Sequence, residues 1–143
     1  MENMTGLKET IRETAIEQVL AMRHCVMYPD QTVEAMRLPD DGDGLHLGLY
    51  EGPALMSVVS LFPRGDALQF RKFATETASQ GKGYGTKLLT YVMEYAAAGT
   101  WTSIWCNARL SAAGFYRRFG MEVTGESWEQ FGIGFIKMEK QLK

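Results

Sequence analysis

The spacing of hydrophobic positions changes along the chain and divides it into predicted helices and strands. Apolar residues recur every three or four positions over 16–27 and 84–98, as in a helix with one buried face. In other stretches apolar and polar residues alternate, which is typical of a strand. The pattern predicts helices at about 16–27, 31–36, 84–98 and 109–119. It predicts strands at about 7–12, 45–50, 54–62, 67–75, 101–106, 121–124 and 132–140.

Turn-forming residues separate these elements. Pro29 ends the first helix, and the segment 39–44, rich in Asp and Gly, is interpreted as a polar turn. Gly99 and Gly120 are placed where helix C-caps belong, and Asn107 is a candidate N-cap for the last helix. The order of elements predicts an α+β fold: a mixed, mostly antiparallel central sheet of six to seven strands flanked by about four helices.

Length and composition limit the classes of protein. At 143 residues we expect one domain over 1–143. Fifteen basic and 17 acidic residues give a formal net charge of −2, which argues against a nucleic-acid partner. No apolar run approaches the roughly 20 residues of a membrane span, and the N-terminus lacks the pattern of a signal peptide. Cys25 and Cys106 are expected to be buried thiols, so the sequence predicts a soluble, cytoplasmic protein with no metal site.

A glycine-rich turn at Gln80–Gly85 lies between a predicted strand and a predicted helix. Backbone N–H groups and the positive end of the helix dipole would face one point there, which is the arrangement of an anion-binding site. The P-loop pattern is absent, and Thr86 occupies the place of the third glycine of the dinucleotide-binding fingerprint. A nucleotide-binding protein that uses this turn for another phosphate ligand remains a weaker alternative.

The turn reads Gln80-Gly-Lys-Gly83-Tyr-Gly85 and fits the pattern Gln/Arg-x-x-Gly-x-Gly/Ala. It resembles the pyrophosphate loop of the GNAT superfamily of acetyl-CoA-dependent N-acetyltransferases. The segment from Trp105 to Glu122, with Asn107, Tyr116 and a Phe-Gly step, is similar to the superfamily's second characteristic region. The resemblance implies a GNAT-like sheet in which the fourth and fifth strands splay apart.

The resemblance also implies where acetyl-CoA binds. The backbone of the fourth strand would bond the pantetheine arm as an added strand, and a bulge there would polarise the thioester carbonyl. Backbone N–H groups of the turn would hold the pyrophosphate, with Lys82 adding charge. The side chain of Asn107 would hydrogen-bond the arm, or serve only as an N-cap. The implied cofactor-binding residues are Phe73, Ala74, Thr75, Gln80, Gly81, Lys82, Gly83, Tyr84, Gly85, Thr86 and Asn107.

Tyr116 matches the superfamily's general acid, which would protonate the leaving thiolate. Core packing beside Phe115 and Phe119 is the alternative. The general base is left unassigned. Histone-type members carry a Glu at the position of Gln69, which cannot accept a proton, and for Glu76 and His46 a surface or packing role is favoured.

These residues predict an acyltransferase that moves an acetyl group from acetyl-CoA directly to an amine of an unidentified small molecule or peptide. A non-catalytic acyl-CoA sensor or interaction module on the same fold is the alternative. The resemblance places the acceptor near Tyr28–Gly44 and Gly125–Gly132, where Trp128 and Phe131 could line a pocket or a dimer contact. A homodimer is a reasonable expectation for the superfamily.

Overall fold

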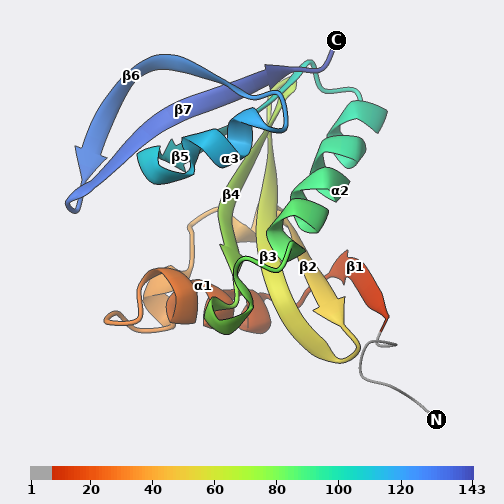
Figure 1. The fold of residues 1–143 in the computed structure, drawn as a ribbon, viewed down its shortest axis with the longest axis vertical. Coiled ribbons are helices and arrows are strands. Elements are labelled where there is room, and N and C mark those ends of the chain that lie inside the picture. The colour runs from red at the N-terminus through yellow and green to blue at the C-terminus, as the bar shows by residue number, and fades with distance from the viewer. Residues whose placement is uncertain (1–7) are drawn as a thin grey trace. The chain divides into compact units, whose positions relative to one another are not determined.

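A computed structural model describes residues 8–143, and Figure 1 labels its elements. The first predicted strand residue, Leu7, and the segment considered for a signal peptide lie outside the described residues. The elements in chain order are β1 (Glu9–Glu13), α1 (Ile16–Met27), β2 (Leu45–Glu51), β3 (Ala54–Arg64), β4 (Ala67–Thr75), α2 (Tyr84–Ala98), β5 (Ser103–Arg109), α3 (Ala113–Arg117), β6 (Glu122–Gln130) and β7 (Ile133–Gln141).

The strands form one mixed sheet in the order β1-β2-β3-β4-β5-β7-β6. The pairs β1–β2, β2–β3, β5–β7 and β6–β7 are antiparallel. The parallel pair is β4–β5, joined from Ala67–Gln69 to Ser103–Trp105. The predicted α+β class and the mixed seven-stranded sheet are therefore confirmed.

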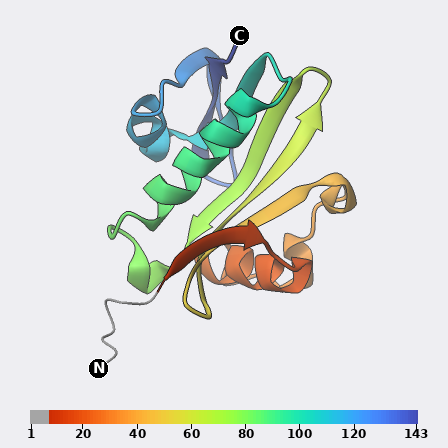
Figure 2. The same cartoon turned by 90° about the vertical axis from the view of Figure 1, so that its right-hand side faces the viewer.

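The chain forms two compact units. Unit 1 contains the described residues up to Leu61 together with Lys72–Tyr91, and unit 2 contains Phe62–Arg71 and Val92–Lys143. β3, β4 and α2 each contribute residues to both units. In Figure 2 the red strand β1, which is an edge strand of the sheet, faces the viewer.

In unit 1, α1 packs its apolar face against the sheet. Val19 and Met22 of α1 are buried with Val58 of β3 and Ala74 of β4. Because Ala74 is one of the predicted cofactor residues, this contact fixes the end of β4 that the resemblance assigns to the pantetheine arm.

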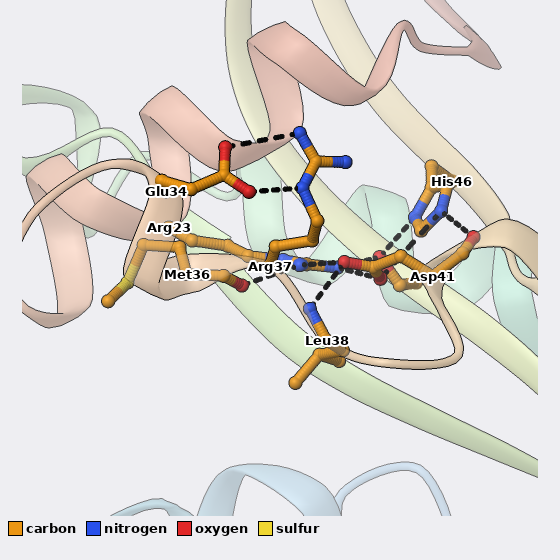
Figure 3. A network of polar contacts seen from close by, with 8 residues as sticks. Arg23, Glu34, Met36, Arg37, Leu38, Asp41 and His46 are labelled. Carbon is orange, nitrogen blue, oxygen red and sulfur yellow. Dashed lines mark hydrogen bonds and ion pairs between the residues drawn. The ribbon is translucent and has the colours of Figure 1, made fainter.

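A buried ion pair lies beside this core (Figure 3). Arg23 of α1 is fully buried and donates to both carboxylate oxygens of Asp41, at 2.8 and 2.9 Å. The same guanidinium donates to the carbonyl of Met36 at 3.0 Å and to Ser60 Oγ at 2.9 Å. One side chain therefore joins α1, β3 and the segment between α1 and β2.

His46 completes this network. Its Nε2 lies 2.9 Å from the carbonyl oxygen of Asp41, and its Nδ1 lies 2.7 Å from Ser60 Oγ. A carbonyl only accepts, so Nε2 carries the hydrogen, and in the neutral ring Nδ1 accepts from the serine hydroxyl. Asp41 was expected in a polar turn, but 6% of it is exposed, and the neighbouring Asp43 is the exposed residue.

The predicted helix at 31–36 is wrong. A single 3-10 turn at Glu34–Met36 is observed, with the N–H of Met36 donating to Val33 O at 3.0 Å. The carbonyl of Met36 accepts from Arg23, and Pro39 follows closely, so the turn does not continue as an α-helix. Residues 8–143 thus contain three α-helices rather than about four.

The elements of unit 2 also differ from the prediction. The strand expected at 101–106 extends to Arg109, because β7 pairs with it along its whole length. A 3-10 turn at Leu110–Ala112 and the five-residue α3 replace the predicted helix at 109–119. β6 continues to Gln130, well beyond the expected end at 124, because it pairs with β7 again after an irregularity. Asn107 therefore lies inside a strand, and its role as an N-cap is excluded.

Candidate functional site

The predicted cofactor residues fall in both units: Phe73–Thr75 and Gln80–Thr86 lie in unit 1, and Asn107 lies in unit 2. In unit 1, the glycine-rich turn leads directly into α2. Gly81 and Gly83 have φ angles of +82° and +89°, which favour glycine. The amide of Gln80 donates to the carbonyl of Thr75 at 3.1 Å and ties the turn to the end of β4.

The N-terminus of α2 leaves backbone donors free of the helix ladder. The N–H of Lys87 makes a bond to the carbonyl of Gly83 at 3.1 Å, so the amides that precede it in the first turn have no i−4 partner within α2. These are the N–H groups of Tyr84, Gly85 and Thr86. They provide a set of donors next to the positive end of a 15-residue helix.

Gly85 allows β4 and α2 to approach closely. A Cβ atom on Gly85 would lie 3.2 Å from the Phe73 ring and 3.4 Å from Thr75 Oγ1. Ser57 Oγ donates to the carbonyl of Ala74 and lies 3.0 Å from Thr75 Oγ1. The structure therefore brings the predicted residues of β4 and of the turn together.

Tyr84 and Lys82 differ in how they could act. Tyr84 is buried, and its hydroxyl donates to Glu51 at 2.9 Å, which raises the pKa of the phenol. Its side chain thus anchors α2, and only its backbone is left for a ligand. Lys82 is exposed, whereas the nearby Lys87 forms an ion pair with Glu9 at 2.7 Å.

In β4, the backbone of Lys72 is left-handed, with φ of +55°. The sequence pattern did not predict this conformation. Such a conformation is unusual for a non-glycine residue within a strand and often accompanies functional sites. Its ammonium lies 5.4 Å from the ring centre of Tyr28, just after α1. The resemblance implies a bulge in the fourth strand, and Lys72 directly precedes Phe73 in β4.

In unit 2, Tyr116 is buried on α3 among aromatic rings. The ring centres of Phe70 and Phe115 lie 5.6 and 5.4 Å from that of Tyr116. Burial raises the pKa of its phenol well above the usual value, the nearby Cys106 raises it further, and the charge of Arg109 opposes the shift. The hydroxyl stays protonated near neutral pH, as both the packing and the proton-donor roles require.

The two cysteines were expected to be buried, which is wrong for Cys25 and confirmed for Cys106. Burial raises the pKa of Cys106 to about 12. Its thiol is thus protonated near neutral pH, which argues against a covalent acetyl-cysteine.

Asn107 lies in the middle of β5 with an exposed side chain, opposite Lys137 of β7. The structure rules out the N-cap and leaves the side chain available for a ligand. The assignment to the pantetheine arm stays a prediction.

None of the three residues weighed as a general base occupies a convincing position. Gln69 is buried and accepts from Arg64 at 2.8 Å. Glu76 accepts from Ser79 Oγ at 2.8 Å. His46 uses both ring nitrogens inside unit 1, as expected for a packed imidazole. Within residues 8–143, no group of three metal-binding side chains is found.

Comparisons with known proteins agree with this geometry. Residues 10–142 match the family model described as the acetyltransferase (GNAT) domain. The chain therefore belongs to the GNAT family of acetyltransferases, and it is an acyltransferase.

Individual relatives are similar over nearly their whole length. A Bacillus subtilis protein named "Uncharacterized N-acetyltransferase YitI" is 27% identical over 93% of this chain and 96% of its own. The crystal structure of a putative N-acetyltransferase from Lactobacillus plantarum superposes with a TM-score of 0.82 at 24% identity, covering 96% of this chain and 99% of that chain. A Bacillus subtilis acetyltransferase in complex with CoA gives a TM-score of 0.72 at 16% identity, covering 96% and 99%.

The family match favours an enzyme over a non-catalytic binding module. In the part of the chain that the structure describes, no helix is both long enough and apolar enough to cross a membrane.

Proposed function

We propose that this protein transfers the acetyl group of acetyl-CoA directly to an amine of a small molecule or peptide. The observation that carries the proposal is the turn before α2. Two glycines with positive φ, at 81 and 83, lead into a helix whose first amides have no partner in its ladder. Backbone donors at a helix N-terminus suit a pyrophosphate.

Different residues of unit 1 bind different parts of acetyl-CoA. The amides of Gly81–Thr86 hold the pyrophosphate, and Lys82 adds a positive charge at the rim. The backbone of Phe73–Thr75 bonds the pantetheine arm, and Gln80 fixes the turn by its bond to Thr75. Asn107, in unit 2, donates a side-chain hydrogen bond to the arm.

Transfer proceeds without a covalent enzyme intermediate. The amine nitrogen attacks the thioester carbonyl, the new C–N bond forms, and the C–S bond breaks. The irregular backbone at Lys72 supplies an N–H that polarises the carbonyl. The phenol of Tyr116 gives its proton to the departing sulfur, the amine proton leaves to solvent, and solvent returns a proton to the Tyr116 phenolate.

Two measurements test this function. Calorimetric titration with coenzyme A measures binding, and a thiol-detecting dye measures coenzyme A released from acetyl-CoA in the presence of a panel of amines. We expect binding, together with thiol release that depends on at least one amine. No binding of coenzyme A at millimolar concentration contradicts the proposal, and binding without release across the panel supports a sensor or interaction module instead.

Four further properties are proposed. A single domain over 1–143 fits the sheet that runs through both units. A cytoplasmic location fits two free thiols, and the net charge of −2 fits a partner other than nucleic acid. A homodimer is proposed from the resemblance alone.

A further inference from the structure

Three strands of unit 2 present one face whose side chains are fixed by the strand register. Residues directly opposite each other in antiparallel strands point to the same face. The pairing therefore places three cross-strand rows on one face of β5, β7 and β6. These rows are Trp105–Glu139–Glu122, Asn107–Lys137–Thr124 and Arg109–Phe135–Trp128.

Aromatic rings make up one end of this face. Trp128 and Phe135 are stacked, with ring centres 5.9 Å apart and an interplanar angle of 20°. Trp128 is 39% exposed although it is a large apolar side chain. Figure 1 shows the β6–β7 hairpin that carries both rings. The stack offers a flat apolar surface on which a planar group can lie.

Two cations lie on the same face as the stacked rings. Arg109 lies directly opposite Phe135, and Lys137 lies two residues further along β7. Within residues 8–143 neither forms an ion pair; the ammonium of Lys137 lies 4.5 Å from the ring centre of Trp105. Both side chains are only half-buried, so their charges are available to an anion.

The two ends of this face differ in charge. The acidic residues Glu139 and Glu122 share the row with Trp105, and the stacked rings lie at the other end. An anionic group is thus favoured between Arg109 and Lys137 and disfavoured beside the glutamates. Positions 135 and 137 of β7 are roughly 7 Å apart along the strand, a spacing that suits one ligand with a ring and an anionic group.

This face also contains or adjoins residues proposed to act in cofactor binding and catalysis. Asn107, proposed to bond the pantetheine arm, lies in its middle row. Arg109 is close enough to Tyr116 for its charge to act on the phenol. Both relationships lie within unit 2.

We propose that Arg109, Lys137, Phe135 and Trp128 form an acceptor platform, which binds amines that carry both an aromatic ring and a carboxylate. The ring lies on the Trp128–Phe135 stack, and the carboxylate binds between Arg109 and Lys137, with Arg109 able to donate two parallel hydrogen bonds. The assignment rests on the proposed function, because it names the substrate class of the same reaction.

Three probes separate the parts of this recognition. L-Phenylalanine has a ring, a carboxylate and an amine; phenethylamine lacks the carboxylate, and glycine lacks the ring. Binding of each is measured by ligand-observed NMR in the presence of saturating coenzyme A. We expect L-phenylalanine to bind at least tenfold more tightly than either fragment.

Variants locate the binding on the platform. Arg109→Gln and Lys137→Gln are each expected to weaken L-phenylalanine about tenfold and to leave phenethylamine within twofold. Trp128→Ala is expected to weaken both aromatic probes. The matched controls are Lys140→Gln, on the opposite face of β7, and Tyr91→Ala on α2, which is as exposed as Trp128.

Equal binding of the three probes, or unchanged L-phenylalanine affinity in both cation variants, overturns the platform. Loss of binding in the controls as well overturns it in the same way. The proposed function is tested separately, by the release of coenzyme A from acetyl-CoA. If coenzyme A is released with simple amines and substitution of Arg109 or Trp128 does not change the rate, the transferase is supported and the platform is contradicted. If L-phenylalanine binds specifically but no coenzyme A is released, the platform is supported and the transferase is contradicted.

Discussion

Arg23 and Asp41 meet through two hydrogen bonds of 2.8 and 2.9 Å in the interior of unit 1, where the guanidinium has no exposed surface. The carboxylate also accepts from the N–H of Leu38 at 2.8 Å. The Nε atom of Arg23 is buried without a hydrogen-bond partner among the described residues. The cation therefore depends on Asp41 for its charge compensation.

Removing the charge of Asp41 is expected to destabilise the folded protein. Asp41→Asn leaves the buried guanidinium uncompensated, and we expect the free energy of unfolding to fall by about 3 kcal/mol. Urea denaturation at neutral pH measures the change. The control is Glu34→Gln, which removes an exposed Arg37–Glu34 pair of similar geometry, at 2.6 Å. A denaturation midpoint that falls equally in both variants contradicts the argument.

The same pair predicts a dependence of stability on pH. Burial alone would raise the pKa of Asp41, but hydrogen bonds from Arg23 and Leu38 and the positive charge of Arg23 lower it overall from 3.8. A carboxyl whose pKa is lowered by folding stabilises the folded state above its unfolded pKa, and that contribution is lost as pH falls through the folded value.

We therefore expect the stability difference between the wild type and Asp41→Asn to be constant from neutral pH to about 5 and to shrink below about 4. Urea midpoints of both proteins from pH 7 to pH 3 provide the measurement. Other carboxylates titrate in both proteins and cancel in the difference. A difference that grows as pH falls has the wrong sign and contradicts the assignment.

The backbone of the glycine-rich turn predicts an effect on coenzyme A binding. Gly83 has φ of +89° and open space where a Cβ would stand, so Gly83→Ala strains the backbone without a clash. We expect the dissociation constant for coenzyme A to rise about tenfold, which is 1.4 kcal/mol. Calorimetric titration measures it.

The control is Gly114→Ala in α3, which also has open space but no positive φ. It is expected to leave coenzyme A affinity unchanged. Equal affinities for the wild type and both variants remove the turn from the cofactor site.

The phenol of Tyr116 is expected to matter for turnover more than for binding. Tyr116→Phe keeps the ring beside Phe70 and Phe115 and removes the proton donor. We expect kcat for an accepted amine to fall by about 100-fold while the dissociation constant of coenzyme A changes less than twofold. Tyr95→Phe on α2, where the ring packs on Trp101, is the control. Unchanged kcat in Tyr116→Phe leaves that side chain with a packing role.

Local signals predicted some elements well. The boundaries of α2 follow from apolar residues at helical spacing after Gly83, and those of β4 from alternation between two turns. Both elements are specified by residues close together in sequence, so their periodicity is sufficient. The glycine-rich turn was found for the same reason.

Elements that depend on distant partners were predicted poorly. Asn107 has the preferences of an N-cap, but pairing with β7 keeps it in a strand. The segment around Asp41 has the composition of a surface turn, and the ion pair of its buried carboxylate is with Arg23, 18 positions away in the sequence. The left-handed backbone of Lys72 has no glycine to signal it. Tertiary pairing decided the positions of Asn107 and Asp41.

The interdependence of Arg23 and Asp41 limits how this protein can diverge. A lineage that loses either residue alone inherits an uncompensated charge in its interior, whereas a double replacement by apolar residues of similar volume avoids that penalty. Homologues should therefore retain both residues or have exchanged both, and the two positions should covary.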